Sequence, residues 1–130
     1  MADWLKIGRD TDWLDVTAEM EAGANHVSGR LLLRRRRDEG MLLLDDLVVD
    51  KSGTSTLLRI GTGWRPFSVR RDDWWVPNSA VQSDAGTVNI STSGYVVGYL
   101  LVPGRVMSGR IVWDIAQPWP STYPGTEAQL

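Results

Sequence analysis

Apolar or alternating segments, each separated from the next by turn residues, run along most of the chain. The clearest pair is 29–37 and 41–50, which flank the polar residues Asp38-Glu39-Gly40 and have the pattern of a β-hairpin. Further segments rich in β-branched, aromatic or alternating residues are expected to be strands: 13–17, 56–60, 67–76, 87–91, 95–102 and 109–115. Short strands at intervals of roughly ten residues predict an all-β fold, an antiparallel β-sandwich of the jelly-roll-like kind.

The two ends of the chain lack this pattern. Residues 1–12 mix apolar and charged residues, so we expect an N-terminal arm or a poorly packed lead-in ahead of a single domain over 13–130. The segment 117–130 contains three prolines, which fix φ and exclude a central strand. We expect this extended segment to lie across its own domain or a neighbouring subunit. The residues expected to anchor it are Trp119, Pro120, Tyr123 and Pro124.

Composition excludes several classes of site. The chain has 130 residues, a formal net charge of −2, no cysteine and one histidine. The absence of cysteine excludes disulfides and thiolate zinc sites, and one histidine excludes a multi-histidine metal site. No apolar run approaches the roughly 20 residues of a membrane-spanning helix, so we expect no membrane insertion. We expect neither a metal nor any other cofactor.

The run Arg34–Arg37 is the densest charge feature. It is read either as a site for nucleic acid or an anionic glycan, or as a solvated hairpin end with acidic residues nearby. The net charge is negative and the basic residues do not form a stripe, so we expect no nucleic-acid partner. Alternate arginines of a strand point to opposite faces. Some of them are therefore expected to point toward a core, or toward acidic residues of a neighbouring subunit.

The residue types needed for catalysis are present but not suitably arranged. His26 has no nucleophile motif of the Gly-x-Ser-x-Gly type to serve, so we read it as a hydrogen-bonded structural histidine. The pairs Asp45/Asp46 and Asp72/Asp73 are adjacent in sequence, and neighbours in a strand face opposite ways. We therefore expect no catalytic residues and no enzymatic activity.

Seven tryptophans against one phenylalanine make the aromatic residues the more open question. Aromatic side chains dominate cores and interfaces, but exposed ones also stack on sugars. Trp74 and Trp75 are adjacent, so in a strand one of them faces inward and the other faces outward or toward a partner. They are the candidate glycan-contact residues.

Three motifs, in this order, resemble those of a known family. They are Gly63-Trp64-Arg65-Pro66, the segment 86–96 (GTVNISTSGYV) and the segment 119–128 (WPSTYPGTEA). With them, the chain from about Trp13 to its end resembles the C-terminal domains of minor tail and tail-fibre proteins of tailed bacteriophages that infect actinobacteria. The chain departs from the family pattern at Trp64, where phenylalanine is more usual, and in the order of small residues over 121–123.

The resemblance implies an all-β, usually trimeric subunit at a tail tip or on a fibre, with residues 1–12 as its N-terminal attachment arm. It implies a virion structural protein without catalytic motifs, made in the host cytoplasm and carried on the tail rather than the head. Its expected partners are two further copies of itself, other tail or baseplate proteins, and a host cell-surface glycan. Gly63, Trp64, Arg65 and Pro66 would define a turn between strands. A capsid head-decoration fibre and a carbohydrate-binding module remain the alternative functions.

Overall fold

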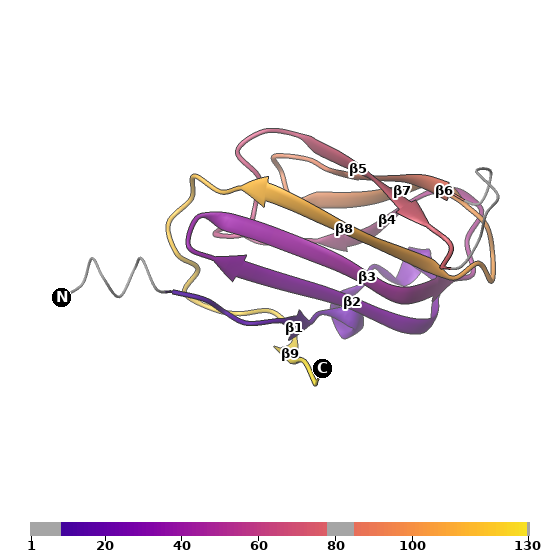
Figure 1. The fold of residues 1–130 in the computed structure, drawn as a ribbon, viewed down its shortest axis with the longest axis horizontal. Coiled ribbons are helices and arrows are strands. Elements are labelled where there is room, and N and C mark those ends of the chain that lie inside the picture. The colour runs from indigo at the N-terminus through magenta and orange to yellow at the C-terminus, as the bar shows by residue number, and fades with distance from the viewer. Residues whose placement is uncertain (1–8, 78–84, 130) are drawn as a thin grey trace.

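Nine antiparallel strands make up the fold of this protein in a computed structural model that describes residues 9–77 and 85–129 (Figure 1). The strands are β1 (Leu14–Asp15), β2 (His26–Arg36), β3 (Glu39–Val49), β4 (Gly53–Arg59), β5 (Arg70–Trp75), β6 (Ala85–Ile90), β7 (Tyr95–Leu101), β8 (Met107–Asp114) and β9 (Thr126–Glu127). Two short 3₁₀ helices, η1 (Thr17–Glu19) and η2 (Ala22–Ala24), connect β1 to β2. The described part of the chain contains no α-helix, so the prediction of an all-β antiparallel fold is confirmed.

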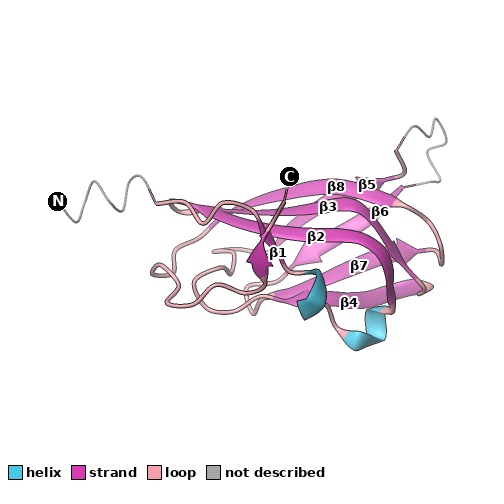
Figure 2. Cartoon of the chain, turned by 90° about the horizontal axis from the view of Figure 1, so that it is seen from below, coloured by secondary structure: helices cyan, strands magenta, loops and turns pink. Residues whose placement is uncertain are grey.

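The strands form one hydrogen-bonded sheet in the order β4-β7-β6-β5-β8-β3-β2-β1-β9. The sheet curls on itself, so that β4 and β7 lie opposite β2 and β3 (Figures 1 and 2). The two stacked layers expected of a sandwich are thus two halves of one curled sheet. β8 joins these halves because it pairs with β3 on one side and with β5, through Trp75 and Ser108, on the other.

The core lies inside this curl. Leu33, Leu42 and Ile111 are partners in adjacent strands β2, β3 and β8, and each is at most 1% exposed. Leu31 and Leu44 form the next row along the same face. Each such side chain contributes roughly 1.5–3 kcal/mol on burial. Strict alternation is not seen here: Leu32 and Met41, next to these inward positions, are 0% and 8% exposed, so both faces of the hairpin are buried at this point.

The β2–β3 hairpin turns earlier than expected. Arg36 pairs with Glu39, so the turn consists of Arg37, which has φ of 55°, and Asp38. Gly40, a predicted turn residue, lies inside β3 and is buried. The predicted hairpin is confirmed, whereas the predicted turn residues are shifted.

Both ends of the described chain pack along this hairpin. Residues 9–12 run beside β2, where the backbone nitrogens of Thr11 and Arg37 donate to the carbonyls of Arg35 and Arg9, each at 2.9 Å. The other residues of the predicted arm, 1–8, lie outside the described residues. At the other end, the segment after β8 crosses the edge of the sheet and ends in β9, which pairs with β1. The proline-rich segment therefore lies across its own domain.

Candidate functional site

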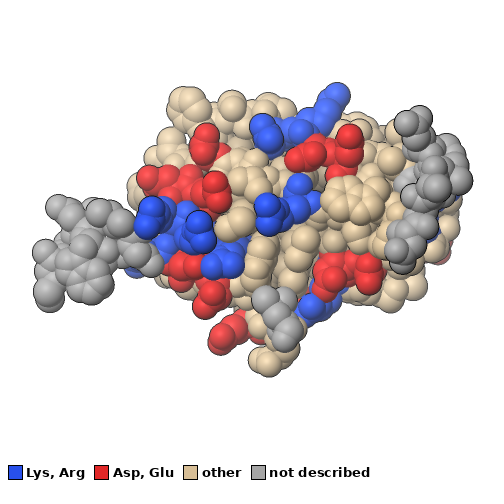
Figure 3. All heavy atoms as spheres, in the orientation of Figure 1, with Lys and Arg blue, Asp and Glu red and all other residues tan. Residues whose placement is uncertain are grey.

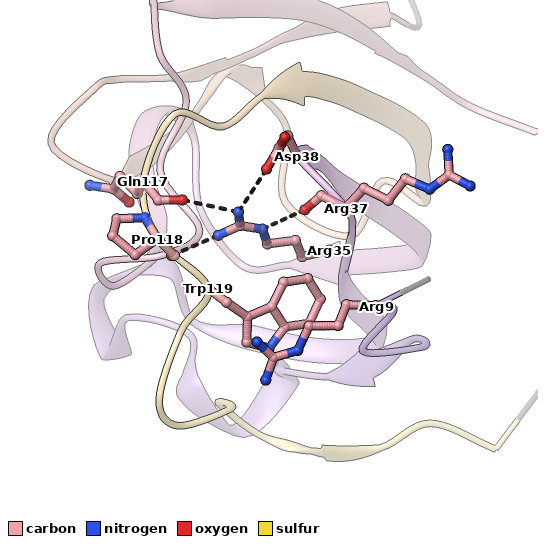
Figure 4. A pocket seen from close by; sticks show the side chains of 7 residues that line it. All are labelled: Arg9, Arg35, Arg37, Asp38, Gln117, Pro118 and Trp119. Carbon is pink, nitrogen blue, oxygen red and sulfur yellow. Dashed lines mark hydrogen bonds and ion pairs between the residues drawn. The ribbon is translucent and has the colours of Figure 1, made fainter. Parts of the chain in front are cut away.

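Arg35, near the end of β2, is a buried arginine with only 2% of its surface exposed. Side chains of a strand alternate between faces, and Arg35 takes an inward position where the sheet meets the C-terminal segment. Each of its five N–H groups donates a hydrogen bond. The acceptors, at 2.6–3.3 Å, are the carboxylate of Asp38 and the carbonyl oxygens of Arg37, Gly63, Gln117 and Pro118. Figure 4 shows all of them except Gly63.

These five bonds join three segments that are distant in sequence. One acceptor belongs to Gly63 of the Gly63–Pro66 turn, two belong to the C-terminal segment, and two lie in the β2–β3 turn. A guanidinium group suits this role because its planar fork fixes the direction of every donor. Arg35 therefore acts as the central clamp of this end of the molecule.

The charge of Arg35 is only partly compensated. Burial lowers the pKa of its guanidinium, while the hydrogen bond and charge of Asp38 raise it and the charge of Arg9 lowers it further. Arginine nevertheless stays protonated in proteins. The side chain of Asp38 is 86% exposed, so water screens its attraction for Arg35. The positive charge of Arg35 is therefore only weakly balanced by Asp38.

Aromatic rings form the second part of the site. The guanidinium carbons of Arg9 and Arg35 lie 4.6 and 5.0 Å from the centroid of the Trp119 ring. The indole N–H of Trp119 donates to the hydroxyl of Tyr123 at 2.9 Å. Tyr123 in turn packs edge-on against Trp64, with 5.9 Å between the ring centroids. The two aromatic anchors of the C-terminal segment are therefore fixed on the domain through Trp64 and Arg35.

Gly63 and Gln117 complete this junction. Gly63 has φ of 95°, and a Cβ at this position would lie 2.7 Å from the Cβ of Pro120. Gln117 accepts hydrogen bonds at its side-chain oxygen from the backbone nitrogens of Gly63 and Arg65, at 2.6 and 3.2 Å. The close approach of Pro120 therefore requires glycine at position 63.

The hairpin motif 86–96 reaches the same end of the molecule. The carbonyl of Gly94 accepts from the backbone nitrogen of Ile60 at 2.8 Å. The carbonyl of Ile60 accepts from Nε of Arg65 at 3.2 Å, and a Cβ on Gly94 would lie 3.0 Å from that nitrogen. All three motifs that carry the resemblance thus meet around Arg65 and Trp64.

The structure brings together two of the three predicted sets of residues. The turn residues Gly63 to Pro66 and the anchors of the C-terminal segment are in contact, and Pro66 and Pro120 are both buried. The anchors act within the chain, one of the two roles considered for them. Pro124 is half-buried beside Gly125, whose φ is 70°.

The third set, Trp74 and Trp75, lies elsewhere. Trp74 is 0% exposed in the core, with its indole N–H donating to the carbonyl of Tyr99 at 3.1 Å, so its ring cannot meet a glycan at the surface. Trp75 points the opposite way and is 51% exposed. Of the two candidate glycan contacts, only Trp75 is accessible. The expectation that one faces inward and the other outward is confirmed.

Arg35 lies within the run Arg34–Arg37 that the sequence singled out, whereas Arg9, Asp38 and Gln117 were not expected at a site. The alternation rule did require that some of the four consecutive arginines point inward. It left open whether their partners would be in the same chain or a neighbour. In the structure Arg35 meets its own chain, and the outward Arg34 pairs with Asp10. For Gln117 the sequence offers no signal, because its role depends on a contact with a turn 52–54 residues earlier.

A cavity of about 420 Å³ lies beside the clamp, at the end of β2 (Figure 4). Its wall combines three arginines, one carboxylate, one amide and one indole ring. The lining residues are Arg9, Arg35, Arg37, Asp38, Gln117, Pro118 and Trp119. Such a wall can bind a charged or hydroxylated small group, but it holds no nucleophile with an adjacent base.

The other candidate polar groups serve structural contacts. His26 is exposed, and its Nε2 donates to the carbonyl of Gly29 at 2.9 Å. Asp45 pairs with Arg30 at 2.7 Å, and Asp46 accepts from the hydroxyl of Ser108 at 3.1 Å. Over residues 9–77 and 85–129, no group of three or more His, Asp or Glu side chains is placed to hold a metal ion.

Within the same described ranges, no helix is long and apolar enough to cross a membrane. Comparisons with protein-family models, curated proteins and solved structures found no match to this chain.

Proposed function

We propose that this protein is a structural component of a tailed-bacteriophage virion, in the minor tail, tail tip or fibre, that supports assembly and contacts the host surface. The proposal extends to a homotrimer of jelly-roll-like sandwich domains that associates with other tail or baseplate proteins. Its site of synthesis is the host cytoplasm and its site of action the virion, on the tail. The protein acts without catalysis.

The observation that carries the proposal is the convergence of the three resembling motifs at one end of the fold. Trp64 contacts Tyr123, Gly63 lies against Pro120, and Arg65 lies beside the Gly94 turn. Residues that form one three-dimensional junction are what a shared architecture would retain, whereas unrelated residues would be scattered. The junction supports the resemblance as a likeness of fold.

Exposed apolar side chains support the trimer. Phe67, Val69, Leu100 and Val27 are 74%, 61%, 65% and 59% exposed in the single chain. Single apolar side chains are common on protein surfaces, but a partner subunit that covered any of these four would remove it from water. The clamp meanwhile holds each C-terminal segment on its own domain, leaving these side chains for contact between subunits.

Size-exclusion chromatography with light scattering tests the trimer. We expect a mass three times that of the 14.5 kDa chain. A monomer at micromolar concentration would overturn the trimeric form of the proposal. Imaging of virions with a labelled antibody tests location: label on the tail is expected, label on the head would assign the protein to capsid decoration, and no label would overturn a virion role.

A second candidate, a carbohydrate-binding module, is favoured by the exposure of Trp75. A glycan array probed with the wild type and with Trp75→Ala tests this candidate function. Glycan binding that is lost in Trp75→Ala but kept in Phe67→Ala, which also removes an exposed aromatic ring, supports the module. Binding that survives Trp75→Ala excludes Trp75 as the glycan contact.

A further inference from the structure

Two positive charges are held over one indole ring at the end of β2. The guanidinium carbons of Arg9 and Arg35 lie 4.6 and 5.0 Å from the centroid of Trp119. The two charges repel each other, and the charge of Arg9 is one cause of the lowered pKa of Arg35. Five hydrogen bonds offset the cost of burying the charge of Arg35. Arg9, in contrast, forms no ion pair with any residue of the described ranges. An anion beside Arg9 would relieve this repulsion.

The adjoining cavity has the size and charge for such an anion. Its volume of about 420 Å³ lies within the range of roughly 300–1,000 Å³ typical of small-ligand sites. Arg9, Arg35 and Asp38 line it with a formal charge of +1, while the guanidinium of Arg37, a further lining residue, extends away from the others (Figure 4). Figure 3 shows that basic side chains gather at this end of the molecule, next to where the described chain begins.

The rest of the wall suits a sugar better than a bare ion. Asp38 is 86% exposed and presents a carboxylate that can accept hydrogen bonds from hydroxyl groups. The side-chain oxygen of Gln117 is occupied by two backbone donors, which fixes the amide and leaves its nitrogen to donate. Trp119 supplies an apolar wall. A carboxylate, an amide and an indole around one cavity match the hydroxyls and the C–H surface of a sugar ring.

We propose that this cavity binds an anionic sugar unit, with Arg9 pairing with its carboxylate or phosphate group and Asp38 and Gln117 contacting its hydroxyls. This proposal rests on the proposed host-surface role, because the anionic sugar would be part of the host surface that the virion recognises. The site differs from the exposed Trp75 considered above, because Trp75 does not line the cavity.

Isothermal titration calorimetry of the full chain with glucuronate, glucose 6-phosphate, glucose and inorganic phosphate tests the proposal. We expect glucuronate or glucose 6-phosphate, or both, to bind more tightly than glucose and more tightly than inorganic phosphate. Whichever of these two charged sugars binds more tightly then identifies the anionic group as a carboxylate or a phosphate. If glucose binds as tightly as the charged sugars, the charge plays no role. If inorganic phosphate binds as tightly as they do, the sugar plays no role. Either result overturns the proposal, as does the absence of binding by all four compounds.

Arg9→Gln and Arg110→Gln form the matched pair of variants. Both remove one exposed positive charge, but Arg110 lies on β8 and does not line the cavity. A charge-assisted hydrogen bond is worth enough that Arg9→Gln should weaken binding roughly tenfold or more, with Arg110→Gln unchanged. Equal weakening by both would reveal a general charge effect and overturn the proposal. Virion imaging is independent of this titration, so failure of either proposal can be told from failure of the other.

Discussion

The indole ring of Trp113 on β8 lies over Gly40 on β3, so closely that a Cβ at position 40 would overlap the ring atoms. The indole N–H of Trp113 also donates to the carbonyl of Trp64 at 2.8 Å, which fixes the ring in place. The same arrangement recurs between Trp74 on β5 and Gly86 on β6. Trp113 and Trp74 thus each pack against a glycine of the adjacent strand.

Gly40→Ala is therefore expected to destabilise the fold by about 1–3 kcal/mol, the usual cost of overpacking a core. Urea unfolding followed by tryptophan fluorescence measures the change. Gly23→Ala is the control, because an added Cβ there meets no atom within 4 Å. We expect that control to stay within about 0.5 kcal/mol of the wild type. Equal stability of the two variants would show that Trp113 yields to the new methyl group.

Arg35→Met removes the clamp while keeping much of its apolar length. Four carbonyls and Asp38 lose their donor, and each unsatisfied buried acceptor costs about 1–3 kcal/mol, so we expect a loss of at least about 3 kcal/mol. Arg110→Met, at an exposed position of β8, is the matched control and should be nearly neutral. The measurement is the free energy of unfolding in urea. If Arg35→Met leaves it nearly unchanged, Arg35 does not act as a clamp.

Gly63→Ala is expected to loosen the C-terminal segment. Alanine at φ of 95° is strained, and its Cβ would also meet Pro120. Gly53→Ala isolates the strain, since Gly53 has φ of 81° but open space around it. We expect about 1 kcal/mol from Gly53→Ala and a further 1–3 kcal/mol from Gly63→Ala. Limited proteolysis should then cut within 117–129 in Gly63→Ala alone; similar cleavage in both variants would argue against the Pro120 contact.

Asp10 gives the stability of the protein a dependence on pH. Its hydrogen bond to Arg34 lowers the pKa of its carboxyl below the ordinary value. A carboxyl whose pKa is lower in the folded state contributes stability above its unfolded pKa of about 4, and loses it as the pH falls through the folded value. Asp10→Asn should therefore cost about 0.5–1 kcal/mol at pH 7 and almost nothing near pH 2, the modest size reflecting a partly exposed pair. Urea unfolding at both pH values checks this, and a difference independent of pH would contradict it.

The alternation of polar and apolar residues predicted the strands well because it reports which side chains share a face. The segment 87–91 became β6 and 95–102 became β7 with nearly the expected bounds. Gly40 was misplaced because glycine serves two purposes. It marks turns, but inside a strand it also makes room for a large neighbour, here Trp113 from a strand about 70 residues later.

Long-range partners could not be predicted for the same reason. The neutral pattern around Gln117 gives no sign that its amide meets Gly63, and the run of arginines does not show which carbonyls surround Arg35. Proline content indicated that the C-terminal segment is extended and stiff, but not which surface it covers. Local sequence sets the shape of each segment, whereas packing between distant segments sets its place.

The clamp around Arg35 also has a consequence for synthesis on the ribosome. Two of its acceptors, the carbonyls of Gln117 and Pro118, are translated more than 80 residues after the arginine. The β2–β3 hairpin therefore emerges with a cationic side chain that stays hydrated until the final stretch has left the exit tunnel. Closure of this end of the domain is a late event, and chains cut short before position 117 would keep it open.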